Sequence, residues 1–239
     1  MRLLDLTMPS PAEDLALDEA LLEEAESSGS ASETLRLWEA HCPFVVMGRS
    51  GRVNEEVELA RCTADRVPVL RRHSGGGTIV AAPGCAFFSL VLSLEHRPQL
   101  RMVDEAHRFV MQTIADGLGA CVGGLELNGS SDLTLADRKV SGNSLRIRRN
   151  FLLYHGTLLL NMDLQLASKY LKHPPRQPSY RRDREHADFI ANLGVPLNSI
   201  KQALIATWNA EQAPSNPPLQ VALELAATKY RSDEWNLQR

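Results

Sequence analysis

The chain has 239 residues, enough for one large domain or two small ones with an ordinary hydrophobic core. Hydrophobic residues make up 44% and charged residues 23%, which argues against disorder, and a net charge of -3 disfavours a broad nucleic-acid-binding face. Four cysteines without a C-x-x-C pair are typical of reduced cytosolic thiols, and the longest apolar run, 86–94, is half as long as a membrane-spanning helix. We therefore expect a soluble cytoplasmic protein that binds neither nucleic acid nor membrane.

The first quarter of the sequence predicts a helix followed by two strands. Apolar residues recur at helical spacing over 14–26, with aspartates and glutamates on the opposite face. A polar loop at 27–32 separates this helix from apolar runs at 34–38 and 44–47, which predict strands. An asparagine that could cap a helix then predicts a short one over 54–61.

Strands interrupted by glycines follow, and a long helix comes after them. The segments 67–72 and 78–80 favour strands on either side of three glycines, which cannot continue a strand comfortably. After a Pro-Gly turn, Phe, Leu and Val dominate 86–94, the strongest strand candidate. The segment 102–118 has an apolar stripe at helical spacing and acidic residues in its first turn, so it predicts a helix.

The middle of the chain is rich in strand signals, and the C-terminal part is helical. The predicted strands lie at 125–127, 132–135, 138–141, 145–148 and 152–161, with hairpin turns at 128–129 and 149–150. The predicted helices lie at 164–171, 188–193, 197–209 and 219–231. Because strands and helices do not alternate strictly, we expect an α+β fold: a mixed, mostly antiparallel sheet flanked by helices.

Residues 71–78, with the sequence RRHSGGGT, form the first segment suited to chemistry. Glycines let a backbone approach a ligand and present N–H groups to its oxygens, and adjacent arginines supply charge that suits phosphate. Successive residues of a strand point to opposite faces, so Arg71 and Arg72 cannot both face one site unless the chain bends. The structural alternative is a glycine hairpin beside a solvated basic pair, and the spacing fits neither a Walker loop nor G-x-G-x-x-G.

Two further segments contribute candidate side chains. Asp132 precedes the sequence DRKVSG at 137–142, in which Lys139 could neutralise a carboxylate or phosphate. The sequence YHGT at 154–157 places His155 after an apolar strand. The structural alternatives are an exposed lysine paired with a carboxylate and a partly buried histidine with satisfied hydrogen bonds.

Taken in order, these three segments resemble the lipoate–protein ligase A family. The resembling pattern is R-R-x-S-G-G-G, then D-L…D-R-K-V-S-G, then H-G-T-L-L, and the stretches 14–19 and 45–49 also resemble the family's opening. Each motif alone is weak, but the ordered set is highly specific. The resemblance covers residues 1–195, which it implies to be a catalytic domain. Residues 196–239 would then be a short helical tail in place of a full accessory domain, which would be absent, shortened or a separate chain.

The resemblance implies the fold shared by biotin and lipoate ligases and class II aminoacyl-tRNA synthetases. It also implies that ATP and lipoate, with Mg²⁺, give lipoyl-AMP and pyrophosphate, after which a lysine of a lipoyl-domain acceptor protein displaces AMP. Lys139 would be the catalytic residue, and apolar residues around Val80 and Leu153 would line the tunnel for the acyl chain. The implied substrate- and adenylate-binding residues are Arg71, Arg72, Ser74, Gly75, Gly76, Gly77, Thr78, Asp132, Ser141, Gly142, His155, Gly156 and Thr157, and no metal ligand is assigned.

The sequence departs from the family pattern in two places. Gly51 and Arg52 stand where members often carry Gln-Asn, and the segment 79–85 replaces the common V-F-H-D-x-G-N, so that Cys85 takes the place of the Asn. Cys85 is therefore the one nucleophile to consider if the protein is instead an ATP-independent octanoyl or lipoyl transferase. Its structural alternative, which we favour, is a small buried residue at a turn.

Two further functions and a candidate docking surface are consistent with the sequence. A biotin ligase is a weaker enzyme hypothesis, because SGGG together with RKVSG points to lipoate. A non-catalytic carrier of the cofactor or of lipoyl domains would need neither Lys139 nor Arg72. The basic run that could meet an acidic lipoyl domain consists of Arg176, Arg181, Arg182 and Arg184. Its structural alternative is a solvated loop with ion pairs to Asp183 and Glu185.

Overall fold

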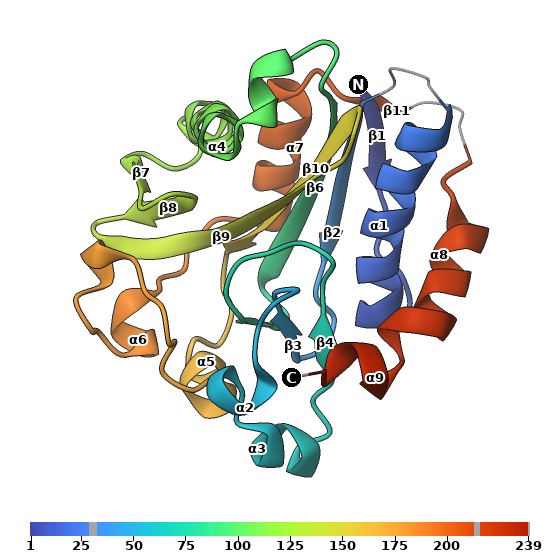
Figure 1. The fold of residues 1–239 in the computed structure, drawn as a ribbon. Coiled ribbons are helices and arrows are strands. Elements are labelled where there is room, and N and C mark those ends of the chain that lie inside the picture. The colour runs from blue at the N-terminus through green and yellow to red at the C-terminus, as the bar shows by residue number, and fades with distance from the viewer. Residues whose placement is uncertain (29–32, 213–215, 239) are drawn as a thin grey trace.

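The computed structural model describes residues 1–28, 33–212 and 216–238, and it is built on one large mixed sheet (Figure 1). The predicted loop at 27–32 therefore lies mostly outside the described residues. Strand β1 pairs in parallel with both neighbours, whereas the other neighbours in this sheet are antiparallel. The strands in order of pairing are β11 (Glu211–Gln212), β1 (Arg2–Asp5), β2 (Thr34–Glu39), β6 (Cys85–Ser93), β10 (Phe151–Leu159), β9 (Arg138–Ile147), β8 (Asp132–Leu135) and β7 (Leu125–Asn128).

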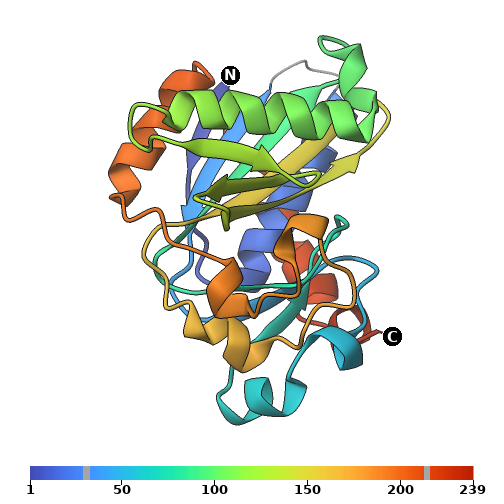
Figure 2. The same cartoon turned by 90° about the vertical axis from the view of Figure 1, so that its left-hand side faces the viewer.

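Helices cover both faces of this sheet. On one face, α1 (Pro11–Ser28) packs beside α8 (Leu219–Leu225) and a π-helical turn at Ala226–Tyr230. On the other face lie α4 (Val103–Leu118) and α7 (Leu197–Thr207), which Figure 2 shows from the side. Strands β6 and β10 are buried along their whole length because they lie between these two layers, which explains their nearly continuous apolar sequences. The predicted α+β fold is confirmed.

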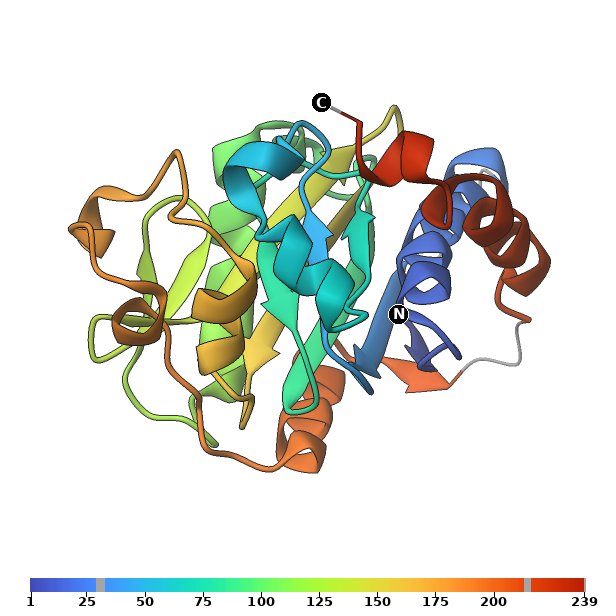
Figure 3. The same ribbon diagram turned by 90° about the horizontal axis from the view of Figure 1, so that it is seen from below.

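A second, smaller sheet lies at one end of the large one. Its order is β4 (Val69–Arg71), β3 (Phe44–Met47) and β5 (Ile79–Ala81), with β3 parallel to β4 and antiparallel to β5. Figure 3 views this end from below, with the C-terminal segment next to α1. The short helices around it are α2 (Val53–Glu56), α3 (Leu59–Ala64), α5 (Gln165–Tyr170), α6 (His186–Phe189) and α9 (Asp233–Asn236). Two 3-10 turns complete the elements at Pro98–Arg101 and Ser179–Arg181.

Several predicted boundaries are wrong for identifiable reasons. The helix expected at 54–61 is two helices, α2 and α3, and α2 starts after Arg52, whose N–H is taken by the Glu56 carboxylate. The helix expected at 188–193 ends at Phe189, because Ile190 and Ala191 extend along β9 and the Ala191 N–H donates to the Lys139 carbonyl. The strands expected at 138–141 and 145–148 are one strand, β9.

Helix α1 departs from its expected pattern in a way that matters for the site. The first half of its predicted polar face is not exposed, since Asp14, Asp18 and Glu19 are buried, as is Glu13 just before it. Buried carboxylates need cations or hydrogen-bond donors. Here the donors come from Arg36 on β2 and from the C-terminal segment around Lys229–Arg231.

Candidate functional site

A cleft opens where the segment after β4 faces strands β9 and β10. We call residues 74–78 the glycine loop. The cleft encloses about 580 Å³, part of it open to solvent. Eight of the predicted site residues line the cleft: Arg72, Gly77, Thr78, Lys139, Gly142, His155, Gly156 and Thr157. Its apolar wall consists of Leu15, Trp38, Val46, Ile79 and Phe87, so the cleft combines an apolar surface with cationic and hydrogen-bonding groups.

The apolar wall includes a neighbour of Val80, but neither Val80 nor Leu153 itself. Val80 points into the small core around β3, and Leu153 packs under α1, so neither lines the cleft. Ile79, the neighbour of Val80 on β5, lines the cleft instead, because successive strand residues point to opposite faces. The indole of Trp38 stacks on Phe87 with ring centroids 3.7 Å apart, which makes this part of the wall aromatic.

The glycine loop is folded around the guanidinium of Arg72. The Arg72 side chain donates to the Ser74 hydroxyl at 3.2 Å and to the carbonyls of Gly75 and Gly77. The Ser144 hydroxyl on β9 also donates to the Gly75 carbonyl, at 2.8 Å. Among the described residues, no acceptor takes the backbone N–H of Gly75, Gly76 or Gly77. With its carbonyls bound to the protein and its N–H groups free, the loop is suited to binding an anion.

Glycine is required at two points where this loop meets strand β3. Gly76 has a φ of +85°, and a Cβ there would lie 2.8 Å from the Arg72 guanidinium. A Cβ on Gly48, just after β3, would lie 1.9 Å from the Gly76 carbonyl oxygen. The glycine in the Val45–Arg49 stretch therefore allows the close approach that shapes the loop.

Arg71 lies away from the cleft and is fully buried. Its guanidinium donates to the carbonyls of Gly48 and Gly51 on one side and of Trp235 and Asn236 on the other. The guanidinium that could contact a substrate is thus that of Arg72, whereas the guanidinium of Arg71 joins the C-terminal segment to the loop after β3.

We expect Arg71→Ala to lower the free energy of unfolding by more than about 3 kcal/mol, because several buried carbonyls would lose their donor together. Denaturant unfolding measures this, and limited proteolysis should show cleavage near residues 233–238. Arg231→Ala is the control, since it breaks an ion pair to Glu13 in which the arginine is 52% exposed, and it should cost less than about 1 kcal/mol. An unchanged midpoint for Arg71→Ala would contradict the anchoring role.

Lys139 lies on β9, the wall of the cleft opposite the glycine loop. Its Nζ lies 2.8 Å from Oδ1 of Asp132, and the Tyr180 hydroxyl donates to Oδ2 of the same carboxylate at 2.7 Å. The lysine side chain is 26% exposed and passes over Gly142, where a Cβ would lie 3.3 Å from the lysine Cε. Asp132 therefore does not line the cleft itself but holds the ammonium group that does.

The remaining predicted residues support the two strands that form the floor. Ser141 is fully buried and exchanges hydrogen bonds with the amide of Asn143, which lines the cleft. Gly156 is required by packing, since a Cβ there would lie 1.7 Å from the Asn143 amide oxygen. Thr78 donates to the Glu56 carboxylate at 2.6 Å, which ties the end of the glycine loop to α2.

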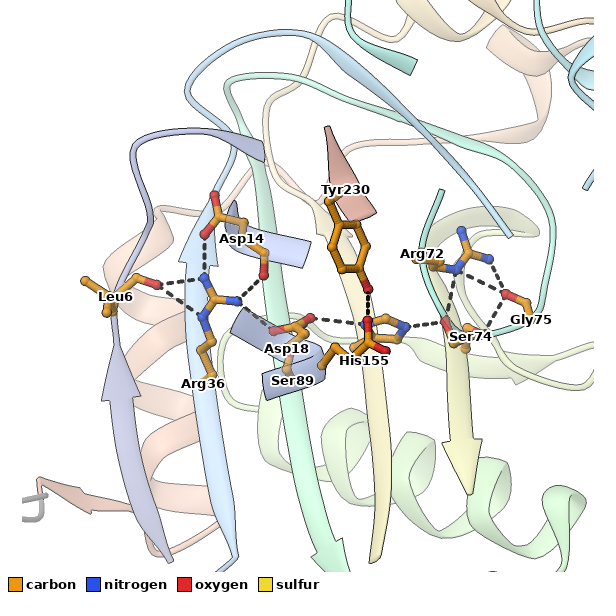
Figure 4. A network of polar contacts seen from close by, with 12 residues as sticks. Leu6, Asp14, Asp18, Arg36, Arg72, Ser74, Gly75, Ser89, His155 and Tyr230 are labelled. Carbon is orange, nitrogen blue, oxygen red and sulfur yellow. Dashed lines mark hydrogen bonds and ion pairs between the residues drawn. The ribbon is translucent and has the colours of Figure 1, made fainter. Parts of the chain in front are cut away.

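His155 belongs to a buried chain of polar contacts that sequence reasoning missed (Figure 4). Its Nε2 lies 2.5 Å from the Ser74 hydroxyl, and its Nδ1 lies 3.1 Å from Oδ2 of Asp18 on α1. Arg72 donates to Ser74 at the start of this chain, and the two ring nitrogens of His155 connect Ser74 to Asp18. The glycine loop is thereby joined to α1 through one imidazole.

Asp18 is itself held by groups from two strands. Arg36 donates to its Oδ1 at 2.7 Å, and the Ser89 hydroxyl donates to Oδ2 at 2.7 Å. Although burial opposes ionisation, Arg36 and the hydrogen bonds from His155 and Ser89 hold the pKa of Asp18 below its usual value. Asp14 shares the same guanidinium, but burial dominates there and raises the pKa of Asp14 to about 7. One buried arginine thus contacts two carboxyl groups whose pKa values shift in opposite directions. The group with the lowered pKa, Asp18, is the one that contacts His155.

Burial also affects two neighbours of this chain. It lowers the pKa of Arg72 to about 10, which leaves the guanidinium charged at neutral pH. It lowers the pKa of His73 to about 3, so this imidazole is neutral. Arg72 therefore keeps its positive charge beside the cleft, where the ammonium group of Lys139 also lies.

The stretch DLALDE at 14–19 could have revealed Asp18, since an aspartate on a buried helix face opposite a strand arginine suggests an ion pair. The sequence does not show that Asp18 contacts His155, because the two residues are 137 positions apart. Asn143 and Ser144 lie on β9, a few residues after Lys139, and both line the cleft. Sequence reasoning missed them because it divided β9 into two separate strands.

The basic run at 176–184 is largely engaged within the protein. Arg181 is buried against the ring of Phe189, and Arg184 lies 3.4 Å from Asp137 and donates to its carbonyl. Arg182 lies 4.0 Å from the same carboxylate. The loop therefore forms internal ion pairs, as the structural alternative expects. The partner is Asp137, however, and not the expected Asp183 and Glu185.

All four cysteines fall within the described residues, and none lines the cleft. Cys85 is buried at the start of β6, and burial raises its pKa to about 12, so its thiol is not activated. Among the described residues there is no group of three His, Cys, Asp or Glu side chains arranged to hold a metal ion. In that same part of the chain, no helix has the length and hydropathy to cross a membrane.

Known protein sequences similar to this chain carry two kinds of name. Residues 10–209 match the family described as lipoyl protein ligase A/B catalytic domain. Octanoyltransferase LipM of Geobacillus kaustophilus is 24% identical, over 100% of this chain and 98% of that protein. Putative lipoate-protein ligase A of Aeropyrum pernix is 36% identical, over 67% of this chain and 58% of that protein. The chain thus spans nearly all of the first relative and little more than half of the second.

Solved structures with the same fold include lipoate ligases. A putative lipoate protein ligase of Thermoplasma acidophilum with bound lipoic acid has a TM-score of 0.81 and 25% identity, over 100% of this chain and 99% of that one. A lipoate-protein ligase A bound with ATP has a TM-score of 0.80 and 24% identity, over 99% and 98%. A structure described as a bi-partite lipoate protein ligase and its E2 lipoyl domain, also from T. acidophilum, has a TM-score of 0.80 and 24% identity, over 100% and 97%.

Proposed function

The chain belongs to the lipoyl protein ligase A/B catalytic-domain family, and we propose that within it the chain is an ATP-dependent lipoate–protein ligase. The protein is an enzyme of the lipoate ligase and transferase family. In the proposed reaction, a lipoate carboxylate oxygen attacks the α-phosphorus of ATP and pyrophosphate leaves. A lysine amine of an acceptor lipoyl domain then attacks the acyl carbon, loses a proton and displaces AMP.

The observation that carries this proposal is the placement of two fixed cationic groups on facing walls of one cleft. Arg72 lies behind the glycine loop, and Lys139 lies on β9 across from it. On the Arg72 side, the N–H groups of Gly75, Gly76 and Gly77, which have no acceptor in the described part of the chain, offer donors to anionic oxygens. Joining a carboxylate to a phosphate brings negative charges together, so such a meeting point lowers the barrier to forming the anhydride.

The apolar wall supports an aliphatic acyl substrate. Trp38, Phe87 and Ile79 would bury the chain of lipoate, while its carboxyl end would lie toward Lys139. Ser74 and His155, held by Asp18, keep the glycine loop in one position at that end of the cleft. Lipoic acid and ATP are the ligands that the structures of two similar proteins contain, in support of these substrates.

No cluster of potential metal ligands is found in the described residues, so they do not fit a resident metal ion. Mg²⁺ usually binds one or two carboxylates together with substrate phosphates. We propose that any Mg²⁺ enters with the triphosphate, and the protein's own contribution is the charge of Arg72 and Lys139.

The proposed acceptor is a lipoyl-domain protein, in line with the E2 lipoyl domain named for one similar structure. The proposed organisation is a catalytic domain over 1–195 with short C-terminal helices. Helix α7 and strand β11 pack on the large sheet, and α9 is tied to Arg71, so these elements form part of the same compact body. A separate accessory chain and a cytoplasmic location belong to the same proposal.

An octanoyltransferase is the second candidate, because full-length similarity extends to proteins of that name. The argument against it is that no cysteine lines the cleft. We expect Cys85→Ser to retain activity within about threefold, since a buried thiol with a pKa near 12 is a poor nucleophile. Cys62→Ser, at an equally buried cysteine, is the control for folding. Abolished acyl transfer in Cys85→Ser alone would favour the transferase.

The deciding experiment combines the purified protein with lipoate, ATP and an apo lipoyl domain. A ligase releases pyrophosphate only when lipoate and ATP are both present and adds the mass of a lipoyl group to the acceptor. A transferase modifies the acceptor from an acyl thioester without ATP. A non-catalytic carrier binds lipoate or the acceptor but produces neither signal.

A further inference from the structure

Three arginines border the glycine loop, and we call Arg49, Arg146 and Arg148 the arginine rim. Arg146 lies on β9, and Arg148 follows its end. Alternate residues of a strand share one face, so both continue the face on which Gly142 and Ser144 line the cleft. Ser144 contacts the loop at the Gly75 carbonyl, and Arg49 donates its backbone N–H to the Ser74 carbonyl at 2.8 Å. The rim therefore borders the loop from both the β3 side and the β9 side.

The charges of this rim are poorly neutralised. Among the described residues, no carboxylate or other acceptor pairs with the side chains of Arg49 and Arg146. Arg148 has only Glu23 at 3.9 Å, and its own side chain is 42% exposed. Burial and the charges of Arg49 and Arg148 lower the pKa of Arg146, which reflects repulsion within the rim.

The nearest carboxylate on α1 cannot supply the missing charge. Glu19 acts on Arg146 at a distance, but its two oxygens are already taken by Lys229 and Tyr230, at 2.7 Å and 2.6 Å. An exposed cluster of like charges lowers stability slightly and attracts anionic partners. This surface contrasts with the loop at 176–184, where Asp137 already pairs with two of the arginines.

We propose that the arginine rim is the docking surface for the acceptor protein, which it binds through acidic side chains flanking the target lysine. The inference rests on the proposed function and adds to it the place and the chemistry of acceptor recognition. The target lysine must enter a cleft that already carries Arg72 and Lys139, and its own positive charge is repelled there. Carboxylates beside the lysine, paired with the rim, offset this repulsion and speed the encounter.

The test is the double variant Arg49→Glu/Arg148→Glu, whose side chains are both exposed. We expect the KM for an apo lipoyl domain, and the Kd measured directly by anisotropy, to rise about tenfold or more, because rim charges set the association rate. Pyrophosphate release with lipoate and ATP but no acceptor should stay within twofold. The wild-type dependence of acceptor KM on salt should become flatter in the variant.

The matched control is Arg176→Glu/Arg182→Glu, which makes the same charge change on the basic loop and should leave acceptor binding within twofold. Unchanged acceptor Kd in the rim variant, or a larger change in the control, would overturn the proposal. A raised KM for ATP without acceptor would assign the rim to nucleotide phosphates and would also overturn it. Because the Kd requires no turnover, a wild-type protein that binds the acceptor without lipoylating it would refute the proposed function and leave the docking test intact.

Discussion

Replacing Lys139 by alanine is expected to slow lipoate-dependent pyrophosphate release by roughly 10²–10³-fold. The reason is that Lys139 supplies the cationic group on the β9 wall, across the cleft from Arg72. The same variant should slow transfer of the lipoyl group from preformed lipoyl-AMP, because the developing charge on the carbonyl oxygen and the leaving phosphate lies at the same place. Pyrophosphate release and the acceptor's mass shift measure the two steps separately.

Folding should be almost unaffected by Lys139→Ala, because the lysine is partly exposed and its single ion pair to Asp132 is worth at most about 1 kcal/mol. Lys169→Ala is a matched control. Lys169 lies on α5, outside the lining of the cleft, and its Nζ forms an ion pair with Asp65 at 2.6 Å, which the substitution breaks. The control should retain full activity. Wild-type rates for Lys139→Ala would refute its catalytic role and with it the proposed mechanism.

Asp18→Asn is expected to lower kcat by about 10²-fold although Asp18 is 1% exposed, because the loss of its charge frees His155 and, through Ser74, the glycine loop. A loop displaced by an ångström no longer presents its N–H groups to the reacting oxygens. The KM for lipoate should change less than kcat, because the apolar wall of Trp38 and Phe87 is untouched. Steady-state kinetics with lipoate as the varied substrate measures both.

The stability cost of Asp18→Asn should be roughly 1–3 kcal/mol at neutral pH. Asp18 has a pKa below its ordinary value of 3.8, so its stabilising contribution is fully present above that pH and is lost as the pH falls through the lower, folded-state pKa. Denaturant unfolding should therefore show a difference from wild type that shrinks in strong acid. Arg36 keeps Asp14 as a partner, which limits the loss.

Ser89→Ala provides the control for Asp18. It removes a different hydrogen bond to the same carboxylate oxygen, at 2.7 Å, and leaves the contact between Asp18 and His155 in place. We expect a similar loss of stability, about 1 kcal/mol, with activity within a fewfold of wild type. If Ser89→Ala and Asp18→Asn reduced activity equally, the effect would come from general loosening of the core.

Much of the fold was predictable because hydrophobic periodicity is local. The strands around 86–94 and 152–159 are rich in apolar residues and buried over their length, and the helix at 103–118 has a clear apolar stripe. Strand β1 and the edge strand β11 escaped prediction because they are only four and two residues long, and their pairing joins the two ends of the chain. The order of strands in the sheet has no local signal either.

The sequence by itself determined the family and the fold class, and it supplied the candidate residues for the site. Arg72, the glycines and Lys139 became candidates because each lies in a short motif and the ordered set of motifs resembles the family's pattern. It also allowed that one of the two adjacent arginines has a structural role, since strand residues alternate. It did not show which arginine has that role.

Only the tertiary structure decided which polar groups are satisfied by the protein and which remain free for a ligand. Arg71 is bound by carbonyls from a segment about 165 residues away, and His155 is oriented by Asp18 from the other end of the domain. Likewise, Arg182 and Arg184 of the basic loop pair with Asp137, whereas within the described part of the chain the side chains of Arg49 and Arg146 have no ion-pair partner. Hydrogen bonds and ion pairs depend on distances of about 3 Å between atoms, and folding brings those atoms together without regard to their separation in sequence.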